Sequence, residues 1–332
     1  MQGLAAGALT VVGAPKALAE PAGSPAAPTT EGNGRSAVPA AQLAESLALA
    51  CSWLTDVAQV KTAKLTTESD GGFLHDSWLG SIRGEYTVAN RSYLGAGRFR
   101  DGYSFRQRKW VTPPGLLSCP GSKENRLLFD DATFLKVWRR TGEARMKDIF
   151  YATAEGLLAE EEPSGNWIRY WPCNARTRTL HPRRAYWWGL PFVDAYRDSG
   201  LARHLACAIR VGDWYINAMR TDGGMFRDTQ ESFRTPSFGH ETSGICCAMI
   251  IWHELALLDD SPRWRAASDQ ALHYCLRGQF REVRDPNLRG AILEQVRPPD
   301  GTDSSPYHLR DLSTIFYAQA VSRMLGRPTA LH

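Results

Sequence analysis

The sequence predicts an all-α fold in which helical hairpins repeat side by side. Apolar residues recur at helical spacing in paired segments, and a short turn joins the two segments of each pair. The turns recur about every sixty residues, and a long connection rich in Trp, Tyr, Arg and Asn follows each pair. Such hairpins bury their apolar faces by stacking, and a curved row of them closes into an (α/α) toroid or barrel. All the long connections then lie on one rim, where they can build one cleft.

The length and composition favour one large domain. The chain has 332 residues, of which 43% are hydrophobic, so it can bury a sizeable core. We expect residues 41–332 to form a single toroidal catalytic domain. Residues 1–40 consist mainly of Ala, Gly, Pro, Ser and Thr, and Ala17, Leu18 and Ala19 resemble a signal-peptidase site. This segment predicts a leader with a disordered linker, and therefore a secreted or periplasmic protein.

Charge and motifs exclude several functional classes. The net charge of +4 comes without the strongly basic stripe that is typical of nucleic-acid binding. No apolar run reaches the ~18 residues that a membrane span needs. P-loop, dinucleotide-binding, zinc-protease and α/β-hydrolase motifs are absent, so no cofactor is expected. The cysteines form no CxxC pair, so no metal site is expected, and several occupy apolar helical positions that predict core residues: Cys207, Cys246, Cys247 and Cys275.

The elements follow in order from the apolar periodicity and the turn residues. A first helix is expected over 41–60, and the Gly-rich and aromatic region 66–122 predicts an extended loop. Short turns at Gly142, Gly200, Ser261 and Gly326 separate the paired helices that follow. These helices are expected near 125–140, 144–160, 184–198, 202–220, 241–258, 263–280 and 307–324. The long connections are expected near 161–183, 221–239 and 281–306.

The first long connection offers aromatic rings and an amide. Tyr170 and Trp171 lie in a predicted loop, where an aromatic ring either caps the core or stacks on the apolar face of a sugar. Asn174 can hydrogen-bond a substrate carboxylate without adding charge. The same amide, coming soon after Pro172, also fits an Asx turn.

A histidine enters a predicted helix from the second long connection. His240 follows Gly239 at a helix N-terminus, where the helix dipole disfavours the imidazolium ion. Its neutral form can therefore act as a base near neutral pH. The alternative is a capping or buried histidine. Arg234 lies in the same connection and is a candidate for binding an acidic substrate.

The third candidate is a tyrosine at the start of the last predicted helix. Tyr307, Arg310 and Asp311 have the spacing that places residues on one helical face. If that face lines the toroid, Arg310 and Arg297 lie near Tyr307 and lower its pKa, because nearby cations favour the phenolate. The alternative is a structural pair of Arg310 and Asp311 beside a buried tyrosine.

These residue types suit β-elimination in a polyuronate. That reaction removes a proton next to a carboxylate and expels a sugar oxygen, so it needs a carboxylate neutraliser, a base and an acid. The competing hypothesis is glycoside hydrolysis by two carboxyl groups of the rim, and a non-catalytic glycan-binding toroid is a further alternative. The carboxylates considered for hydrolysis are Asp194, Asp213, Asp222, Asp228, Glu241, Asp300, Asp303 and Asp311.

Three segments resemble a known family. The hairpin repeat resembles the (α/α)-toroid polysaccharide lyases, and the segments 186–191, 237–240 and 307–311 are similar to those of the group acting on glucuronan and alginate, polysaccharide lyase family 38. The resemblance covers roughly residues 120–325. It implies a lyase that cleaves a 1,4-linked polyuronate into products with unsaturated uronate ends.

The resemblance also implies roles for single residues. His240 matches the loop-borne histidine of the family, Tyr307 matches its late tyrosine, and Arg297 or Arg310 matches its carboxylate-binding arginine. The neutraliser is Asn174 or Glu231. We therefore expect His240, Tyr307, Asn174 and Arg297 to be catalytic, and five further residues to bind an acidic polysaccharide: Arg310, Trp171, Tyr170, Arg234 and Trp187.

Overall fold

The computed structural model describes residues 37–58, 93–100, 102–104, 108–111, 127, 129–233, 241–296, 307–309 and 311–327. Within the chain, Val38–His332 forms one compact unit. Residues 1–36 of the predicted leader and linker (1–40), including the proposed cleavage site, lie outside the described residues.

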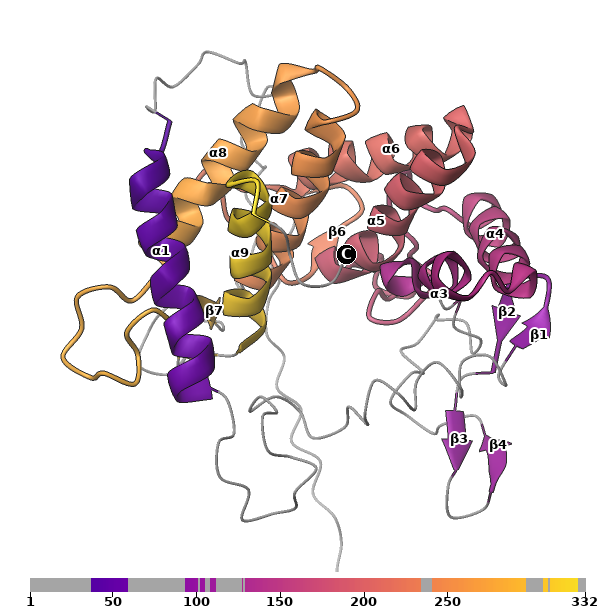
Figure 1. Ribbon diagram of the computed structural model, residues 1–332, viewed down its shortest axis with the longest axis horizontal. Coiled ribbons are helices and arrows are strands. Elements are labelled where there is room, and N and C mark those ends of the chain that lie inside the picture. Colours follow the sequence, from indigo (N-terminus) through magenta and orange to yellow (C-terminus); the bar gives the residue numbers. More distant parts are fainter. Residues whose placement is uncertain are drawn as a thin grey trace, which may run out of the picture. The chain divides into compact units, whose positions relative to one another are not determined.

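Helical hairpins follow one another along the chain, as predicted (Figure 1). The hairpins are α3 (Thr133–Thr141) with α4 (Ala144–Ala159), α5 (Pro182–Ser199) with α6 (Ala202–Ala218), and α7 (Thr242–Ala256) with α8 (Pro262–Arg277). The last helix is α9 (Asp311–Met324), and the first is α1 (Ala40–Trp53), which continues into a π-helical turn over Leu54–Ala58.

Local residue chemistry explains where these helices begin and end. Gly142 and Gly200 terminate α3 and α5 in the left-handed conformation, with φ of 73° and 68°, which glycine adopts without steric cost. Pro182 and Pro262 open α5 and α8, where a missing N–H leaves no hydrogen bond unmade. The short turns predicted from the sequence are therefore confirmed.

The helices form an inner row and an outer row. Along the inner row, α5 packs on α7, α7 packs on α9, and the 3-10 turn before α3 (Asp130–Ala132) packs on α5. In the outer row, α4 covers α3, α6 covers α5, α8 covers α7, and α1 covers α9. Among the described elements no extensive packing joins α1 to α3 or α4, so the two rows are open there. The predicted all-α fold of repeated hairpins is confirmed.

The core lies between the two rows and is rich in large aromatic rings. Nearly every residue of α7 is buried, as expected for a helix enclosed by its neighbours. Gly212 of α6 lets three helices approach closely, because a Cβ there would lie 2.6 Å from Leu255 and 2.8 Å from Trp264. The cysteines predicted to be core residues are fully buried: Cys207, Cys246, Cys247 and Cys275. The fully buried tryptophans are Trp167, Trp188, Trp214, Trp252 and Trp264.

Short antiparallel strand pairs stabilise the connections. The pairs are β1 (Tyr93–Gly95) with β2 (Arg98–Phe99), β3 (Gly102–Ser104) with β4 (Lys109–Val111), β5 (Thr179–Leu180) with β6 (Thr229–Gln230), and β7 (Leu293–Val296) with β8 (Tyr307–Leu309). The third long connection also contacts α1. Gly290 has a φ of +94°, and a Cβ there would lie 2.0 Å from the carbonyl oxygen of Leu49.

Two predicted helices begin later than expected. The helix expected near 125–140 begins at Thr133, because the backbone turns left-handed at Asp131 and Ala132, with φ of 54° and 51°. The helix expected from 307 begins at Asp311, because Tyr307 pairs with Val296 as part of a strand. The predicted helical face of Tyr307, Arg310 and Asp311 is therefore wrong, since an extended strand does not share the helical spacing.

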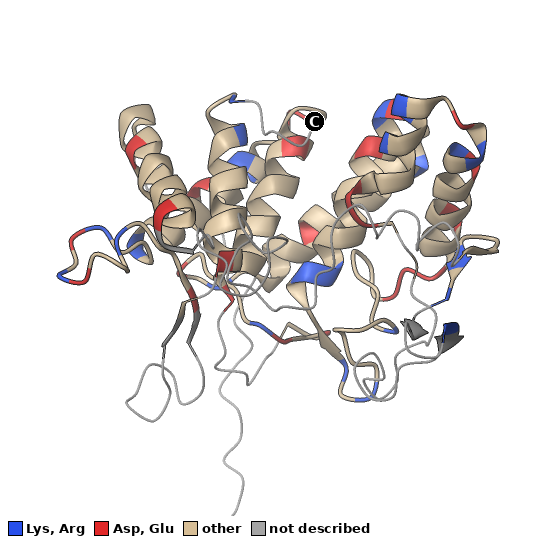
Figure 2. Ribbon diagram, turned by 60° about the horizontal axis from the view of Figure 1, so that its bottom comes forward, with Lys and Arg blue, Asp and Glu red and all other residues tan. Residues whose placement is uncertain are grey.

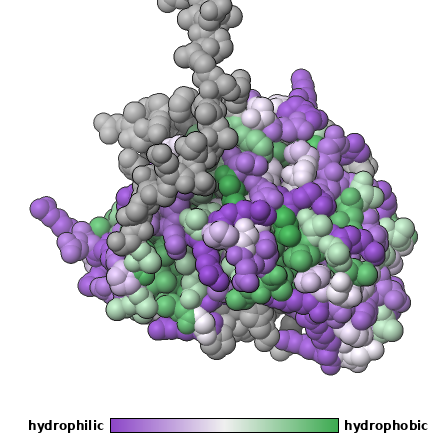
Figure 3. Space-filling view, turned by 90° about the horizontal axis from the view of Figure 1, so that it is seen from above, coloured by the Kyte–Doolittle hydropathy of each residue, from purple (hydrophilic) through white to green (hydrophobic). Residues whose placement is uncertain are grey.

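No described helix combines the length and apolar character needed to cross a membrane. Basic and acidic residues are interspersed along the ribbon (Figure 2). On the face shown in Figure 3, hydrophilic and hydrophobic residues are also interspersed.

Candidate functional site

The long connections meet at one end of the hairpins, as their order along the chain requires. Strand β5 of the first connection pairs with β6 of the second through Thr179–Gln230 and Leu180–Thr229. Strand β7 of the third connection reaches the N-terminus of α7, where Ser243 binds Glu294. The predicted common rim is therefore confirmed for the described parts of these connections.

A buried cluster of ionisable residues joins the connections at this rim. We call it the rim cluster, and it consists of His181, Arg183, Glu241, Ser243 and Glu294. The Nη2 of Arg183 donates to Glu241 Oε1 over 2.8 Å, and His181 Nε2 lies 3.4 Å from Glu241 Oε2. Ser243 donates to Glu294 twice, from its backbone N–H over 3.0 Å and from its hydroxyl over 2.7 Å.

Burial sets the protonation states in the rim cluster. Desolvation and the neighbouring charge of Glu241 raise the pKa of Glu294 to about 7, although the hydrogen bonds from Ser243 act in the opposite direction. Desolvation and the charge of Arg183 lower the pKa of His181 well below its usual value. His181 Nδ1 accepts from the backbone N–H of Arg183, so the neutral ring carries its proton on Nε2, toward Glu241.

A second cluster lies on the inner row of helices. We call it the inner-face cluster, and it consists of Asp131, Lys136, Asp194, Glu254 and Arg323, which come from α3 and the turn before it, α5, α7 and α9. Glu254 holds two arginines: its Oε1 lies 3.2 Å from Arg323 Nε, and its Oε2 accepts from Arg197 over 2.7 Å. Glu254 thereby links α5, α7 and α9.

Asp131 is the unusual member of the inner-face cluster. It and Ala132 are consecutive left-handed residues without the freedom of glycine, and Ala132 is fully buried. Left-handed non-glycine residues each cost on the order of 1 kcal/mol and persist where the surroundings impose them, often at functional sites. This conformation places the Asp131 side chain at the N-terminus of α3.

The carboxyl of Asp131 combines exposure to solvent with a raised pKa. The side chain is exposed to solvent, yet desolvation by surrounding protein is the main cause that raises its pKa, and the charges of Asp130 and Asp194 add to it. Asp194 is partly exposed, and its pKa is also raised by desolvation, while Lys136 lowers the pKa of both carboxyls.

The described candidates of the first connection contact protein groups. The amide oxygen of Asn174 accepts from the backbone N–H groups of Arg176 and Thr177 over 3.0 and 3.3 Å, which is the Asx-turn alternative. Tyr170 is buried, donates to Glu160 and packs edge-on against Trp188. Trp171 is half-buried.

The structure describes the candidates outside the first connection to different extents. Trp187 is half-buried on α5, and the guanidinium of Arg184 lies 5.1 Å from the centre of its ring. For Tyr307 only the backbone is described, in β8. The remaining candidates lie outside the described residues: Arg234, His240, Arg297 and Arg310.

The sequence analysis missed Asp131, Lys136, Glu254 and Arg323 as site residues, while Asp194 and Glu241 were among the carboxylates considered for hydrolysis. One local signal pointed to the missed site: two consecutive acidic residues, Asp130 and Asp131, stand directly before a helix of the inner row. The other members are far apart in the chain. Only the packing of the inner helices brings them together.

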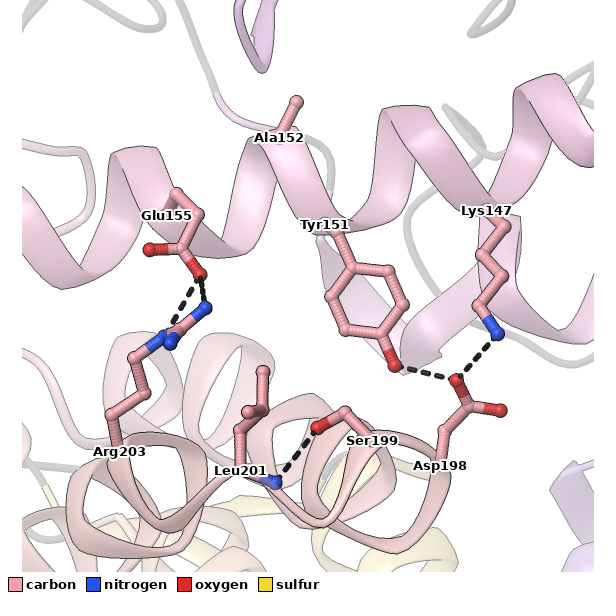
Figure 4. Close-up of a pocket in the computed structure, with 8 residues that line it drawn as sticks. All are labelled: Lys147, Tyr151, Ala152, Glu155, Asp198, Ser199, Leu201 and Arg203. Atoms are coloured by element: carbon pink, nitrogen blue, oxygen red, sulfur yellow. Dashed lines mark hydrogen bonds and ion pairs between the residues drawn. The ribbon is translucent and has the colours of Figure 1, made fainter.

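A pocket of ≈ 390 Å³ lies elsewhere, between α4 and the turn that joins α5 to α6 (Figure 4). In it Tyr151 and Lys147 point toward Asp198, with Tyr151 donating over 2.5 Å and Lys147 Nζ at 3.3 Å. Arg203 binds Glu155 across the same pocket. These charged groups already form pairs with one another, so the pocket lacks the open carboxyls of the inner face.

The comparisons with known proteins found similar structures, but no matching family model and no matching curated protein. Among solved structures, the chain is similar to an unsaturated glucuronyl hydrolase from Bacillus sp. GL1, with 16% identity, a TM-score of 0.44, and coverage of 57% of this chain and 55% of that one. A variant of an α-1,6-mannanase from Salegentibacter sp. HEL1_6 in complex with α-1,6-mannotetrose gives 13% identity, a TM-score of 0.49, and coverage of 74% and 64%.

A possible member of the GH105 family from Klebsiella pneumoniae gives 10% identity, a TM-score of 0.47, and coverage of 63% and 62%. The chain spans less than two thirds of the length of these structures. It is distantly similar in structure to (α/α)-toroid carbohydrate-active enzymes, and this similarity concerns the fold.

Proposed function

We propose that the chain is a carbohydrate-active hydrolase that cleaves a glycosidic bond in an acidic glycan, with Asp131 and Asp194 as its reacting carboxyl groups. The observation that carries the proposal is the environment of Asp131. Its carboxyl is exposed to solvent, desolvated by the surrounding protein, and held by a left-handed backbone at the N-terminus of an inner helix. These features favour a group that reacts with a ligand.

The chemistry needs one carboxyl that donates a proton and one that is ionised. Glycoside hydrolysis uses an acid to protonate the departing sugar oxygen and a carboxylate to activate water or to attack the sugar directly. Asp131 takes the role of the acid, because desolvation and the charges of Asp130 and Asp194 raise its pKa, against the opposing charge of Lys136. Asp194 takes the role of the carboxylate, because Lys136, Arg197 and Arg139 favour its ionised form against the desolvation that raises its pKa.

The cations of the inner face define the substrate class. Lys136 and Arg323 interact electrostatically with Asp131, and Glu254 holds Arg323 through an ion pair. Because Glu254 already holds Arg323, Lys136 is the cation that we assign to a carboxylate or sulfate substituent of the sugar. The proposed substrate is therefore a glycan that contains uronic acid or sulfated sugars.

The second candidate function is the polyuronate lyase that the sequence suggests. One observation favours it: β8, which carries Tyr307, pairs with β7 two residues from Glu294, at the rim. In that mechanism Tyr307 and His240 transfer protons while Asn174 and Arg297 neutralise the uronate. The Asn174 amide oxygen accepts within its own turn, which fixes the side chain and does not use the NH2 group that would donate to a uronate carboxylate.

A panel of acidic glycans distinguishes these functions. Glucuronan, alginate, hyaluronan and a sulfated glycan are incubated with the protein, and each reaction is followed for new reducing ends and for the ultraviolet absorbance of unsaturated uronate. Hydrolysis releases reducing ends without new absorbance. If the ultraviolet absorbance grows together with the number of reducing ends, the lyase replaces the hydrolase as the proposed function. Retention of glycan without any product refutes both and leaves a binding protein.

A further inference from the structure

Two buried cysteines meet where α7 packs on α8. Cys246 lies in α7 and Cys275 in α8, and both residues are fully buried. Their sulfur atoms lie 3.6 Å apart, although the residues are 29 positions apart in the chain. Both are free thiols in the structure, so the contact is a weak hydrogen bond in which either sulfur can be the donor. The fold thus brings two oxidisable groups into direct contact.

The sulfur atoms are close to the separation that a covalent bond requires. A disulfide bond is about 2 Å long, so the sulfurs of Cys246 and Cys275 need to approach by about 1.6 Å. If both side chains turn toward each other equally, each sulfur moves by about 0.8 Å. The two helices belong to one hairpin and already pack on each other, so the packing holds the sulfurs near this position.

We propose that Cys246 and Cys275 form a disulfide bond when the chain folds under oxidising conditions, and that this bond cross-links α7 to α8 and stabilises the hairpin. The proposal is independent of the proposed hydrolysis. Because α7 belongs to the inner row and α8 to the outer row, the cross-link joins the two rows covalently. Under reducing conditions the same chain folds without this bond.

The oxidant is a disulfide of the surroundings, for which glutathione disulfide serves as the probe. The thiolate of one cysteine attacks it, which releases one glutathione and leaves a mixed disulfide on the protein. The thiolate of the other cysteine then attacks the protein sulfur of the mixed disulfide, which forms the bond between the two Sγ atoms and releases the second glutathione. The two protein thiols thus lose two protons and two electrons, and glutathione disulfide accepts both.

Burial determines when this reaction occurs. The thiolate is the reacting form of a cysteine, and burial raises the pKa of the Cys246 thiol well above its usual value. Neither sulfur is reached by solvent in the folded chain, and Tyr317 of α9 lies near enough to both thiols for their charges to affect its pKa. The bond therefore forms while α7 and α8 come together, before the core encloses the pair. Once formed, it is shielded from reductants in the same way.

Refolding of the full chain tests the cross-link. The reduced and denatured protein is refolded with a mixture of reduced and oxidised glutathione, and in parallel with a reductant alone. Free thiols are then alkylated in denaturant, and the protein is digested with trypsin. Because trypsin cleaves after Arg263 and Arg265, the two cysteines fall in separate peptides that only a disulfide joins. We expect mass spectrometry to find the joined peptides in the oxidised sample alone.

A neighbouring cysteine provides the matched control. Cys247 is equally buried and lies in the same tryptic peptide as Cys246, so Cys247→Ala is expected to keep the joined peptides, whereas Cys246→Ala loses them. If Cys246→Ala does not fold, Cys275→Ala makes the same test from the other helix. Alkylation of both cysteines in the oxidised sample overturns the proposal, and so does a bond that joins Cys247 to Cys275.

Thermal unfolding tests the stabilising role of the cross-link. Closing a loop of this size by a disulfide is expected to raise the Tm of the oxidised protein by about 5 °C over that of the reduced protein. The difference is expected to vanish in Cys246→Ala and to persist in Cys247→Ala. Equal Tm values for the cross-linked and the reduced protein overturn the stabilising role.

Discussion

The rim cluster and the inner-face cluster combine the same kinds of residue, but the rim carboxyls are buried whereas Asp131 and Asp194 of the inner-face cluster are reached by solvent. In the rim cluster Glu241 and Glu294 are 3% and 2% exposed, and hydrogen bonds from Arg183 and Ser243 engage both carboxyls. In the inner-face cluster Asp131 is exposed to solvent and Asp194 is partly exposed. Raised carboxyl pKa values occur in both places.

This difference separates a structural role from a chemical one. Burial alone raises a carboxyl pKa, so a raised value does not by itself identify a reacting group. Removing the cation from the buried rim cluster leaves buried charge without compensation and affects folding. On the proposed function, removing Asp131 or Asp194 from the inner-face cluster affects what the protein does to a ligand. The two clusters therefore predict opposite responses to mutation.

The largest expected effect is on turnover. Asp131→Asn removes the proposed acid while keeping the size of the side chain, and loss of a general acid typically costs about 10²–10⁴-fold in rate. We expect kcat to fall by that amount with little change in the unfolding transition. Asp213→Asn is the control, because Asp213 also has a raised pKa but pairs with Arg263 on the outer helices. If both variants keep full kcat in the glycan assay, Asp131 is not the acid.

The next effect is on stability. Arg183→Met leaves Glu241 and Glu294 buried without their cation, and breaking a buried ion pair in this way costs about 3–5 kcal/mol. Denaturant unfolding is expected to show that loss, while the folded fraction keeps its specific activity. Arg263→Met is the matched control, because its ion pair with Asp213 is nearly half exposed and contributes little. Equal losses for the two variants contradict a buried rim cluster.

The parts that local chemistry determines were predictable from the sequence. Gly142 and Gly200 marked the hairpin turns because glycine adopts the left-handed conformation at a helix end without steric cost. The common rim of the long connections followed from the order of the helices. The burial of Cys246 and Cys247 followed from apolar positions on a helix that is hydrophobic nearly all round.

The parts that depend on distant contacts were not predictable. The spacing of Tyr307 and Asp311 suggested a helical face, but strand pairing with Val296 decided the conformation of Tyr307. The left-handed turn at Asp131 and Ala132 contains no glycine or asparagine, the residues from which such a turn is usually predicted. The inner-face cluster draws on four helices, so no local pattern reveals that Arg323 acts electrostatically on Asp131.

A smaller effect concerns the pH dependence of activity. Lys136 lowers the pKa of both Asp131 and Asp194, so Lys136→Met raises both. We expect both limbs of the profile of kcat/KM against pH to move to higher pH, and stability to change by about 0.5 kcal/mol or less. Lys109→Met, at an exposed residue of β4, is the control and leaves the profile in place. If Lys136→Met leaves the profile of kcat/KM against pH unchanged, Asp131 and Asp194 do not take part in the reaction.

The smallest effect sharpens the choice between hydrolysis and elimination. Asn174→Ala removes the acceptor for the N–H groups of Arg176 and Thr177, which costs about 1 kcal/mol, while Asn174→Asp keeps that acceptor. If the residue only shapes its turn, Asn174→Ala loses this stability and both variants keep their activity on the glycan. If its amide neutralises a uronate, both variants lose most of their turnover, and Asn174→Asp suffers more, because it places a negative charge against the substrate carboxylate. Turnover and denaturant unfolding measured side by side therefore assign Asn174 either to the loop or to the reaction.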